Sequence, residues 1–193
     1  MEIDYVDKLP DLKSNWLNYE ILITSHKLQL ARESIKNIFS ISKFKGKDKE
    51  FNSLFKNIFG FSSPNISNVN YTDKYTVLWV RNNCYFVLSD TKSTEIQYKN
   101  LLSIFENTAS ITDQTGGWVV LNLEGDDCRF LLEKLITIDL DNFDNHHVIR
   151  TSIASMNCFI VCETKFQRYN LICPTSYFAT IKSRLIKLIT LLQ

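Results

Sequence analysis

The sequence predicts an α+β fold made of two similar halves, in which helices pack on antiparallel sheets. Three observations support this prediction. Strand-like and helix-like hydrophobic periods alternate along the chain, both halves show them in a similar order, and one set of spacings occurs twice. The 193 residues are 45% hydrophobic, which is enough for a compact core, and only 5 Gly and 3 Pro are available to mark turns.

Composition narrows the classes of function. The chain has 22 Lys and Arg against 21 Asp and Glu, a formal net charge of +1, which argues against a general nucleic-acid binder. No apolar run approaches the roughly 18 residues of a membrane span, and the acidic first ten residues differ from a signal peptide. The 5 cysteines are odd in number and include no CxxC pair, which favours reduced, buried thiols. We therefore expect a cytoplasmic protein.

Residues 1–36 are expected to form a peripheral arm, because their only regular feature is a short helical spacing of apolar residues over 28–35. The remaining residues, 37–193, are expected to form a single α+β domain of two pseudo-repeats, about 37–108 and 109–193.

The first pseudo-repeat begins with a strand-like alternation over residues 39–44 that ends at Gly46. A helix is expected next, because Phe51, Leu54, Phe55, Ile58 and Phe59 form one apolar stripe that stops at a capping Gly60. Two β-rich runs, 75–80 and 84–88, predict a hairpin around Arg81-Asn82-Asn83, since Asn tolerates positive φ. Residues 93–106 then show a helical period.

The second pseudo-repeat opens with a predicted turn over Ile111–Gly117 and a strand over 118–123. A helix is expected over 126–136 with Phe130, Leu131 and Leu135 on its inner face. The segments that follow are a polar loop at 139–147, strands at 148–154, 158–162 and 168–173, and a last helix at 175–192.

An internal repeat underlies the division into halves. In each half a strand ends at a Gly, an Asp follows two residues later, and an aromatic side chain lies one turn into the next helix. Such an Asp can bond free amides of a helix, and the aromatic side chain can dock the helix on the sheet. The paired segments are Phe39-x-Ile41-x-x-Phe44-x-Gly46-x-Asp48-x-x-Phe51 and Trp118-x-Val120-x-x-Leu123-x-Gly125-x-Asp127-x-x-Phe130.

Candidate metal sites are poorly supported by spacing. Asp139, Asp141 and Asp144 begin like a calcium loop, but position six is Asp144 instead of Gly and position twelve is Arg150 instead of Glu. His146 and His147 are adjacent, so in an extended segment they point to opposite faces, and His26 is isolated. The sequence therefore predicts no metal-binding residue.

Cofactor and catalytic motifs are also missing from the sequence. Cys158 and Cys162 share one face of a predicted strand, but no further ligand completes a zinc set, so core packing is the better interpretation. No nucleophile signature, phosphate loop or dinucleotide fingerprint is present. The lysines at 43, 45, 47 and 49 are interrupted by acidic residues, which is typical of a solvated face. We predict no catalytic or cofactor-binding residue in this chain.

Aromatic residues make up 12% of the chain and include Trp16, Trp79 and Trp118. Aromatic side chains are enriched both in interface hot spots and in cores, so both roles stay open for each of them.

The order of these segments resembles the gamma subunit of heterotetrameric sarcosine oxidase, a relative of the folate-binding fold of the glycine-cleavage T-protein. The resemblance covers roughly residues 37–192. The segments that carry it are Ile111–Leu132, then Arg150-Thr151 with Tyr169–Ala179, and Gly60–Asn68 with Val77–Val80 and Tyr85–Leu88.

The resemblance implies a non-catalytic subunit of a complex that oxidatively demethylates sarcosine or a related N-methyl amine and transfers the one-carbon unit to tetrahydrofolate. It implies alpha-type and beta-type flavoprotein subunits and a small zinc-binding delta-type subunit as partners. FAD, FMN, NAD, tetrahydrofolate and zinc would be held by those subunits and none by this chain. The alternative is a stand-alone folate-binding protein or aminomethyltransferase-like protein of the same fold.

Overall fold

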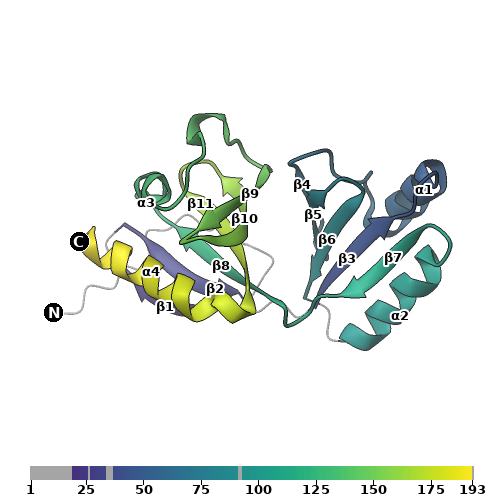
Figure 1. Cartoon of the computed structure of the whole chain (residues 1–193), viewed down its shortest axis with the longest axis horizontal. Helices are drawn as coiled ribbons and strands as arrows, with labels where there is room; N and C mark the ends of the chain where they lie inside the picture. Colours follow the sequence, from purple (N-terminus) through teal and green to yellow (C-terminus); the bar gives the residue numbers. More distant parts are fainter. Residues whose placement is uncertain (1–18, 26, 34–36, 91–92, 193) are drawn as a thin grey trace.

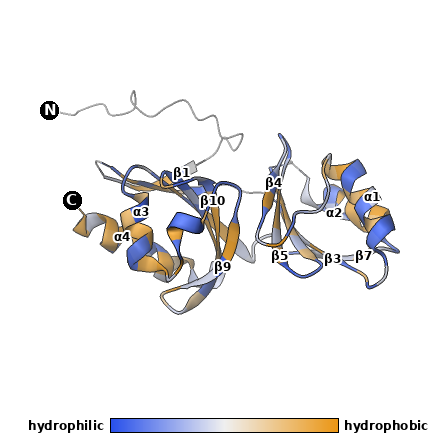
Figure 2. Ribbon diagram, turned by 90° about the horizontal axis from the view of Figure 1, so that it is seen from above, coloured by the Kyte–Doolittle hydropathy of each residue, from blue (hydrophilic) through white to orange (hydrophobic). Residues whose placement is uncertain are grey.

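The computed structural model describes residues 19–25, 27–33, 37–90 and 93–192. They form four layers, in which two facing antiparallel sheets lie between two pairs of helices (Figures 1 and 2). The α+β class with two helix-covered antiparallel sheets is confirmed. None of the described helices is long and apolar enough to cross a membrane.

Most of the expected strands and helices are present with small shifts at their ends. The first half contains β1 (Tyr19–Thr24), β2 (Gln29–Glu33), β3 (Asn37–Lys43), α1 (Asp48–Phe59), β4 (Val69–Tyr71), β5 (Tyr75–Arg81), β6 (Cys84–Ser89) and α2 (Thr94–Phe105). The second half contains β7 (Ala109–Asp113), β8 (Trp118–Glu124), α3 (Cys128–Leu135), β9 (Val148–Ile153), β10 (Met156–Thr164), β11 (Arg168–Pro174) and α4 (Phe178–Leu191).

The two sheets have matching strand orders. Sheet A runs β1-β2-β8-β11-β10-β9, and sheet B runs β4-β5-β6-β3-β7. Each half supplies a strand, a helix, three strands and a helix; β1 and β2 precede the first set and β7 precedes the second, and each of these strands joins the sheet of the other half. Strand β2 leaves β3 to pair with β8, and β7 leaves β8 to pair with β3. The two halves are therefore interlocked by an exchange of their first strands.

Three apolar clusters hold the layers together. Helices α3 and α4 pack on the outer face of sheet A, and α1 and α2 pack on the outer face of sheet B. The third cluster joins the inner faces of the two sheets, with Phe86 of sheet B against Trp118 and Phe159 of sheet A at ring distances of 5.3 and 5.7 Å. We call this contact between the inner faces the seam.

The seam is also closed by main-chain hydrogen bonds at one edge. The segments before β4 and β9 form an antiparallel bridge between Asn68 and His147. Val69 N–H donates to the His146 carbonyl at 2.9 Å, and Val148 N–H donates to the Ser67 carbonyl at 2.7 Å. Since β4 and β9 are edge strands, these bonds continue from one sheet into the other.

The expected peripheral arm is wrong where the structure describes it. Residues 28–33, which have a helical spacing, lie in or beside strand β2, and Leu28, Leu30 and Ala31 are buried. The pairing of β2 with β8 overrides the local period, because an added strand satisfies backbone groups and buries apolar surface at once. Residues 1–18 of that arm, and His26, lie outside the described residues.

Two further expectations from the repeat are corrected. Ile111 lies in β7, so the turn before β8 is confined to residues after Asp113. Phe130, the counterpart of Phe51, is 46% exposed, while Leu131 is buried, because α3 begins at Cys128, one position later than the spacing implies. Neither Asp48 nor Asp127 caps a helix through its side chain; Asp48 pairs with Lys43 instead.

Gly125 shows why the β1–β2 hairpin belongs to the core. Its φ is +134°, and a Cβ at this position would lie 2.0 Å from the Lys27 carbonyl oxygen. The matching Gly46 has a φ of +79° with open space around it. The hairpin backbone thus passes directly over the start of α3, where only a hydrogen fits.

Gly125→Ala is expected to lower the free energy of unfolding by roughly 3 kcal/mol or more, since backbone strain adds to a backbone clash. Gly46→Ala is the matched control and carries strain alone, about 1–2 kcal/mol. Urea denaturation followed by circular dichroism measures both. Equal losses would contradict the close approach of Lys27 and Gly125.

Candidate functional site

A group of polar side chains lies inside the protein beside the seam, all on the inner face of sheet A except one, which comes from β4 of sheet B. We call it the interior polar cluster; its members are Glu33 of β2, Tyr71 of β4, Asn122 and Glu124 of β8, Glu163 of β10, and Arg168 and Asn170 of β11. Glu33, Asn122, Arg168 and Asn170 are all at most 8% exposed.

Strand register brings these residues together. Asn122 pairs with Asn170, and Glu124 pairs with Arg168, across the β8–β11 ladder. Successive strand residues alternate between faces, so Leu121, Leu123 and Leu171 between them join the outer core. The inner face of sheet A is thus apolar at the seam and polar beside it.

Hydrogen bonds connect most of the interior polar cluster. The Asn122 amide donates to Asn170 Oδ1 at 2.9 Å, and the Asn170 amide donates to Glu163 Oε1 at 2.5 Å. Arg168 Nε lies 3.0 Å from Glu163 Oε2 and 4.0 Å from Glu124 Oε2. Burial raises the pKa of Glu163, while Arg168 and the Asn170 hydrogen bond oppose this shift.

Two members of the cluster carry a polar atom that lacks a hydrogen bond. Glu33 Oε1 and the Tyr71 hydroxyl are buried and have no hydrogen-bond partner among the described residues. Burial, reinforced by the nearby Glu163, raises the pKa of Glu33 to about 8, although Arg168 opposes the shift. Burial also raises the pKa of Tyr71. At neutral pH Glu33 is therefore mostly protonated and can donate as well as accept a hydrogen bond.

The cluster suits structural or electrostatic roles better than nucleophilic chemistry. Its titratable groups are three carboxyls, a phenol and a guanidinium, and no Ser or Cys with an adjacent base belongs to it. Within the described part of the chain, no group of three His, Cys, Asp or Glu residues could hold a metal ion.

The acidic loop proposed as a weak calcium candidate is cross-linked by cations. Arg129 donates to both oxygens of Asp141 at 2.7 and 3.2 Å, and Lys165 donates to Asp144 at 2.6 Å. These contacts hold the pKa values of Asp141 and Asp144 below their usual range. Asp139 accepts from the Asp141 amide, so each carboxylate already has a partner within the protein.

The adjacent histidines diverge, but the segment is a turn and not extended, since His146 has a left-handed φ of 64°. The His146 ring meets Tyr71 edge-on at 5.3 Å, and the His147 ring lies 6.3 Å from Phe143. Cys158 and Cys162 are buried in the outer core of sheet A, which confirms the packing interpretation. Burial raises the pKa of each of these two thiols to about 11.

The expectation of a solvated lysine face is wrong for Lys43 at the end of β3, whose side chain is 11% exposed and lies over the Phe51 ring. Lys43 pairs with Asp48, and Lys47 lies 2.9 Å from Glu50. Phe44 is 42% exposed beside them. The opposite charges that alternate in this segment therefore form local ion pairs.

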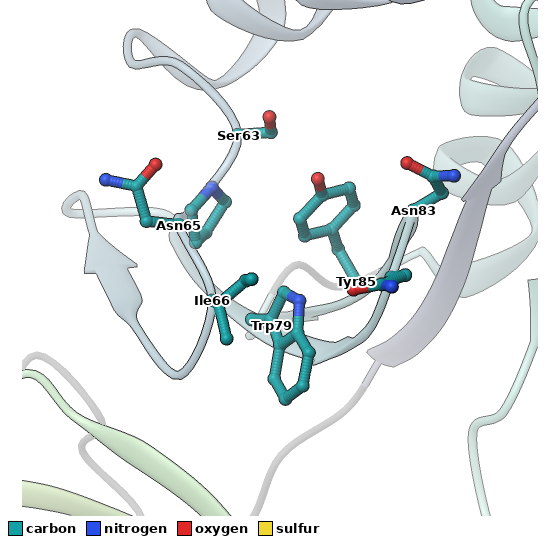
Figure 3. A pocket seen from close by; sticks show the side chains of 8 residues that line it. Ser63, Asn65, Ile66, Trp79, Asn83 and Tyr85 are labelled. Atoms are coloured by element: carbon teal, nitrogen blue, oxygen red, sulfur yellow. The ribbon is translucent and has the colours of Figure 1, made fainter.

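A second candidate site is a surface hollow of about 320 Å³ on sheet B, which we call the Ile66 hollow. Its lining residues are Ser63, Pro64, Asn65, Ile66, Trp79, Asn82, Asn83 and Tyr85. Figure 3 shows the Tyr85 ring standing between the loop of Ser63 and the hairpin turn of Asn83. Ile66 is 68% exposed and no lining residue is charged, while four of the eight lining residues are Ser or Asn.

Sequence reasoning missed the interior polar cluster. The sequence contained one signal of it: each of two apolar strands has one Asn among its buried residues, Asn122 in the first and Asn170 in the second. Glu33 lay in the expected arm, and Glu163 in an expected turn, so neither was read as an interior residue. Only the pairing of β2 with β8 and of β10 with β11 places them near each other.

Comparisons with known proteins identify the fold. No family model matches the chain, and no curated protein matches its sequence. Among solved structures, a chain of the heterotetrameric sarcosine oxidase from Corynebacterium sp. U-96, in complex with pyrrole 2-carboxylate, matches with a TM-score of 0.75 and 16% identity. The match covers 87% of both chains, so the two chains are about equal in length. The likeness shows a shared fold.

Arg168→Met is expected to destabilise the protein by roughly 3–5 kcal/mol at pH 8, because it leaves Glu163 buried without its counter-charge. Protonation of Glu163 relieves this cost, and its pKa is already raised, so the loss should shrink as the pH falls toward 5. Urea denaturation at both pH values measures the difference.

Arg129→Met provides the control, since it breaks an exposed ion pair and should cost little at either pH. Adding Glu163→Gln to Arg168→Met should recover part of the lost stability at pH 8. A loss from Arg168→Met no larger than that from Arg129→Met would contradict the assigned role of Arg168.

Proposed function

We propose that this chain is a non-catalytic structural subunit, of gamma type, in a complex like heterotetrameric sarcosine oxidase. The observation that carries the proposal is the fold shared with one chain of such an enzyme over 87% of both chains. The matched chain is about as long as this one, so the likeness extends over a whole subunit.

The chemistry of the described residues is compatible with an assembly role. The interior polar cluster is enclosed between the sheets and linked by internal hydrogen bonds, and the cysteines are buried in the cores. Large apolar side chains are nevertheless exposed, including Ile66, Ile96 and Leu191 at 68%, 62% and 71%. Such side chains can be covered by a partner subunit.

The finer parts of the proposal follow from the resemblance found in the sequence. The partners would be alpha-type and beta-type flavoprotein subunits and a zinc-binding delta-type subunit, in the cytoplasm. Those subunits would carry FAD, FMN, NAD, tetrahydrofolate and zinc. The complex would oxidise sarcosine or a related N-methyl amine and transfer its one-carbon unit to tetrahydrofolate.

The Ile66 hollow is the surface best suited to the partner contact. Ile66 and Trp79 supply apolar surface, and Asn65, Asn82 and Asn83 supply neutral hydrogen-bonding groups around it, while Tyr85 is largely buried. A partner that covers the hollow buries no lining charge, but it has to match the polar groups with hydrogen bonds.

Co-expression with the flavoprotein subunits encoded by the same genome should give a stable complex on size-exclusion chromatography. Ile66→Asp should weaken it, since a charge would be buried at the contact, while the neighbouring Asn65→Asp adds the same charge without removing apolar area and should weaken it less. A folded chain that remains monomeric beside those subunits would overturn the proposal.

Tight binding of a reduced folate by the isolated chain, followed by Trp emission, would favour the alternative of a stand-alone folate-binding protein.

A further inference from the structure

Glu33 combines three properties that a purely structural residue rarely has together. The residue is 5% exposed, its Oε1 has no hydrogen-bond partner in the part of the chain that the structure describes, and it lies on β2, the strand exchanged between the halves. Across the seam, the buried Tyr71 hydroxyl of β4 also has no hydrogen-bond partner. Unsatisfied buried polar atoms are rare in native proteins, and they often mark a functional constraint.

Among residues 19–25, 27–33, 37–90 and 93–192, no cation faces Glu33 without already being engaged by another carboxylate. Those in electrostatic range are Glu163 on β10, Arg168 on β11 and Tyr71 on β4. Arg168 is already engaged by Glu163 at 3.0 Å, with Glu124 of β8 at 4.0 Å. Beyond these, His146 lies against the Tyr71 ring and in electrostatic range of Glu163.

Charge counting shows what ionisation of Glu33 would do. The interior polar cluster contains three carboxyls and one guanidinium, and Glu124 and Glu163 both lie next to that guanidinium. A charge on Glu33 would therefore be a further negative charge, buried beside Glu163 and without a hydrogen bond to its Oε1. Burying an uncompensated charge is costly. Opening the packing around Glu33 to water would reduce this cost, so ionisation favours a looser seam.

We propose that Glu33 is a pH-sensitive element of the seam: protonated Glu33 allows the two sheets to close over the interior polar cluster, and its ionisation loosens the seam. The inference rests on the packing of this chain alone and does not depend on the proposed function.

The sign follows from the direction of the pKa shift. The folded-state pKa of Glu33, about 8, is above its ordinary value of 4.5. The stabilising effect of the proton is therefore fully present below pH 4.5 and is lost as the pH rises through about 8. The seam is expected to be tightest in acidic solution, to weaken as the pH rises from 4.5, and to be loosest above about pH 8.

The amides of Val69 and Val148 are the direct reporters, because both donate across the edge of the seam. Native-state hydrogen exchange of the full chain, measured by NMR between pH 7 and 9, should show their protection factors falling about tenfold in the wild type. In Glu33→Gln, which keeps the size of the side chain and cannot ionise, this fall should be absent. Glu95→Gln, an exposed glutamate paired with Lys99, is the matched control and should behave like the wild type.

A direct titration guards against a variant that fails to fold. The carboxyl carbon of Glu33 in the wild-type chain should titrate near pH 8 in ¹³C NMR spectra. Titration near pH 4.5, or an equal fall in protection in the wild type and Glu33→Gln, would overturn the proposal.

Discussion

The exchange of β2 and β7 between the two sheets is the constraint on which the rest of the structure depends. Strand β2 belongs to the first half but pairs with β8 of the second, and β7 belongs to the second half but pairs with β3 of the first. Neither sheet can reach its full width without a strand from the other half. The inner faces are therefore held opposite each other by covalent connection, and the seam buries its apolar side chains as a consequence.

The inner face of sheet A carries an energetic cost that the outer faces avoid. Replacing a buried charged network by apolar residues is often neutral or stabilising, so the interior polar cluster is weak support for stability. It does distinguish one arrangement of the sheets from others. The hydrogen bonds from Asn122 through Asn170 to Glu163 are satisfied only when β8, β11 and β10 are in the observed register.

The outer surface offers a different kind of chemistry from the interior. The Ile66 hollow is uncharged and partly aromatic, whereas the acidic loop is covered by ion pairs from Arg129 and Lys165.

Local patterns in the sequence determined most of the strands and helices. Alternation identified β3 and β8, the apolar stripe of α1 ended at Gly60, and Asn83 adopts the positive φ of 60° that the hairpin requires. These features depend on neighbouring residues, which the sequence displays directly. The core packing of Cys158 and Cys162 could be predicted for the same reason. Only the tertiary structure decided that β2 and β7 change sheets, that Phe130 faces outward, and that Glu33, Glu163 and Arg168 gather beside the seam. Those outcomes depend on pairing between residues far apart in the chain, where burial and backbone hydrogen bonding outweigh local preference.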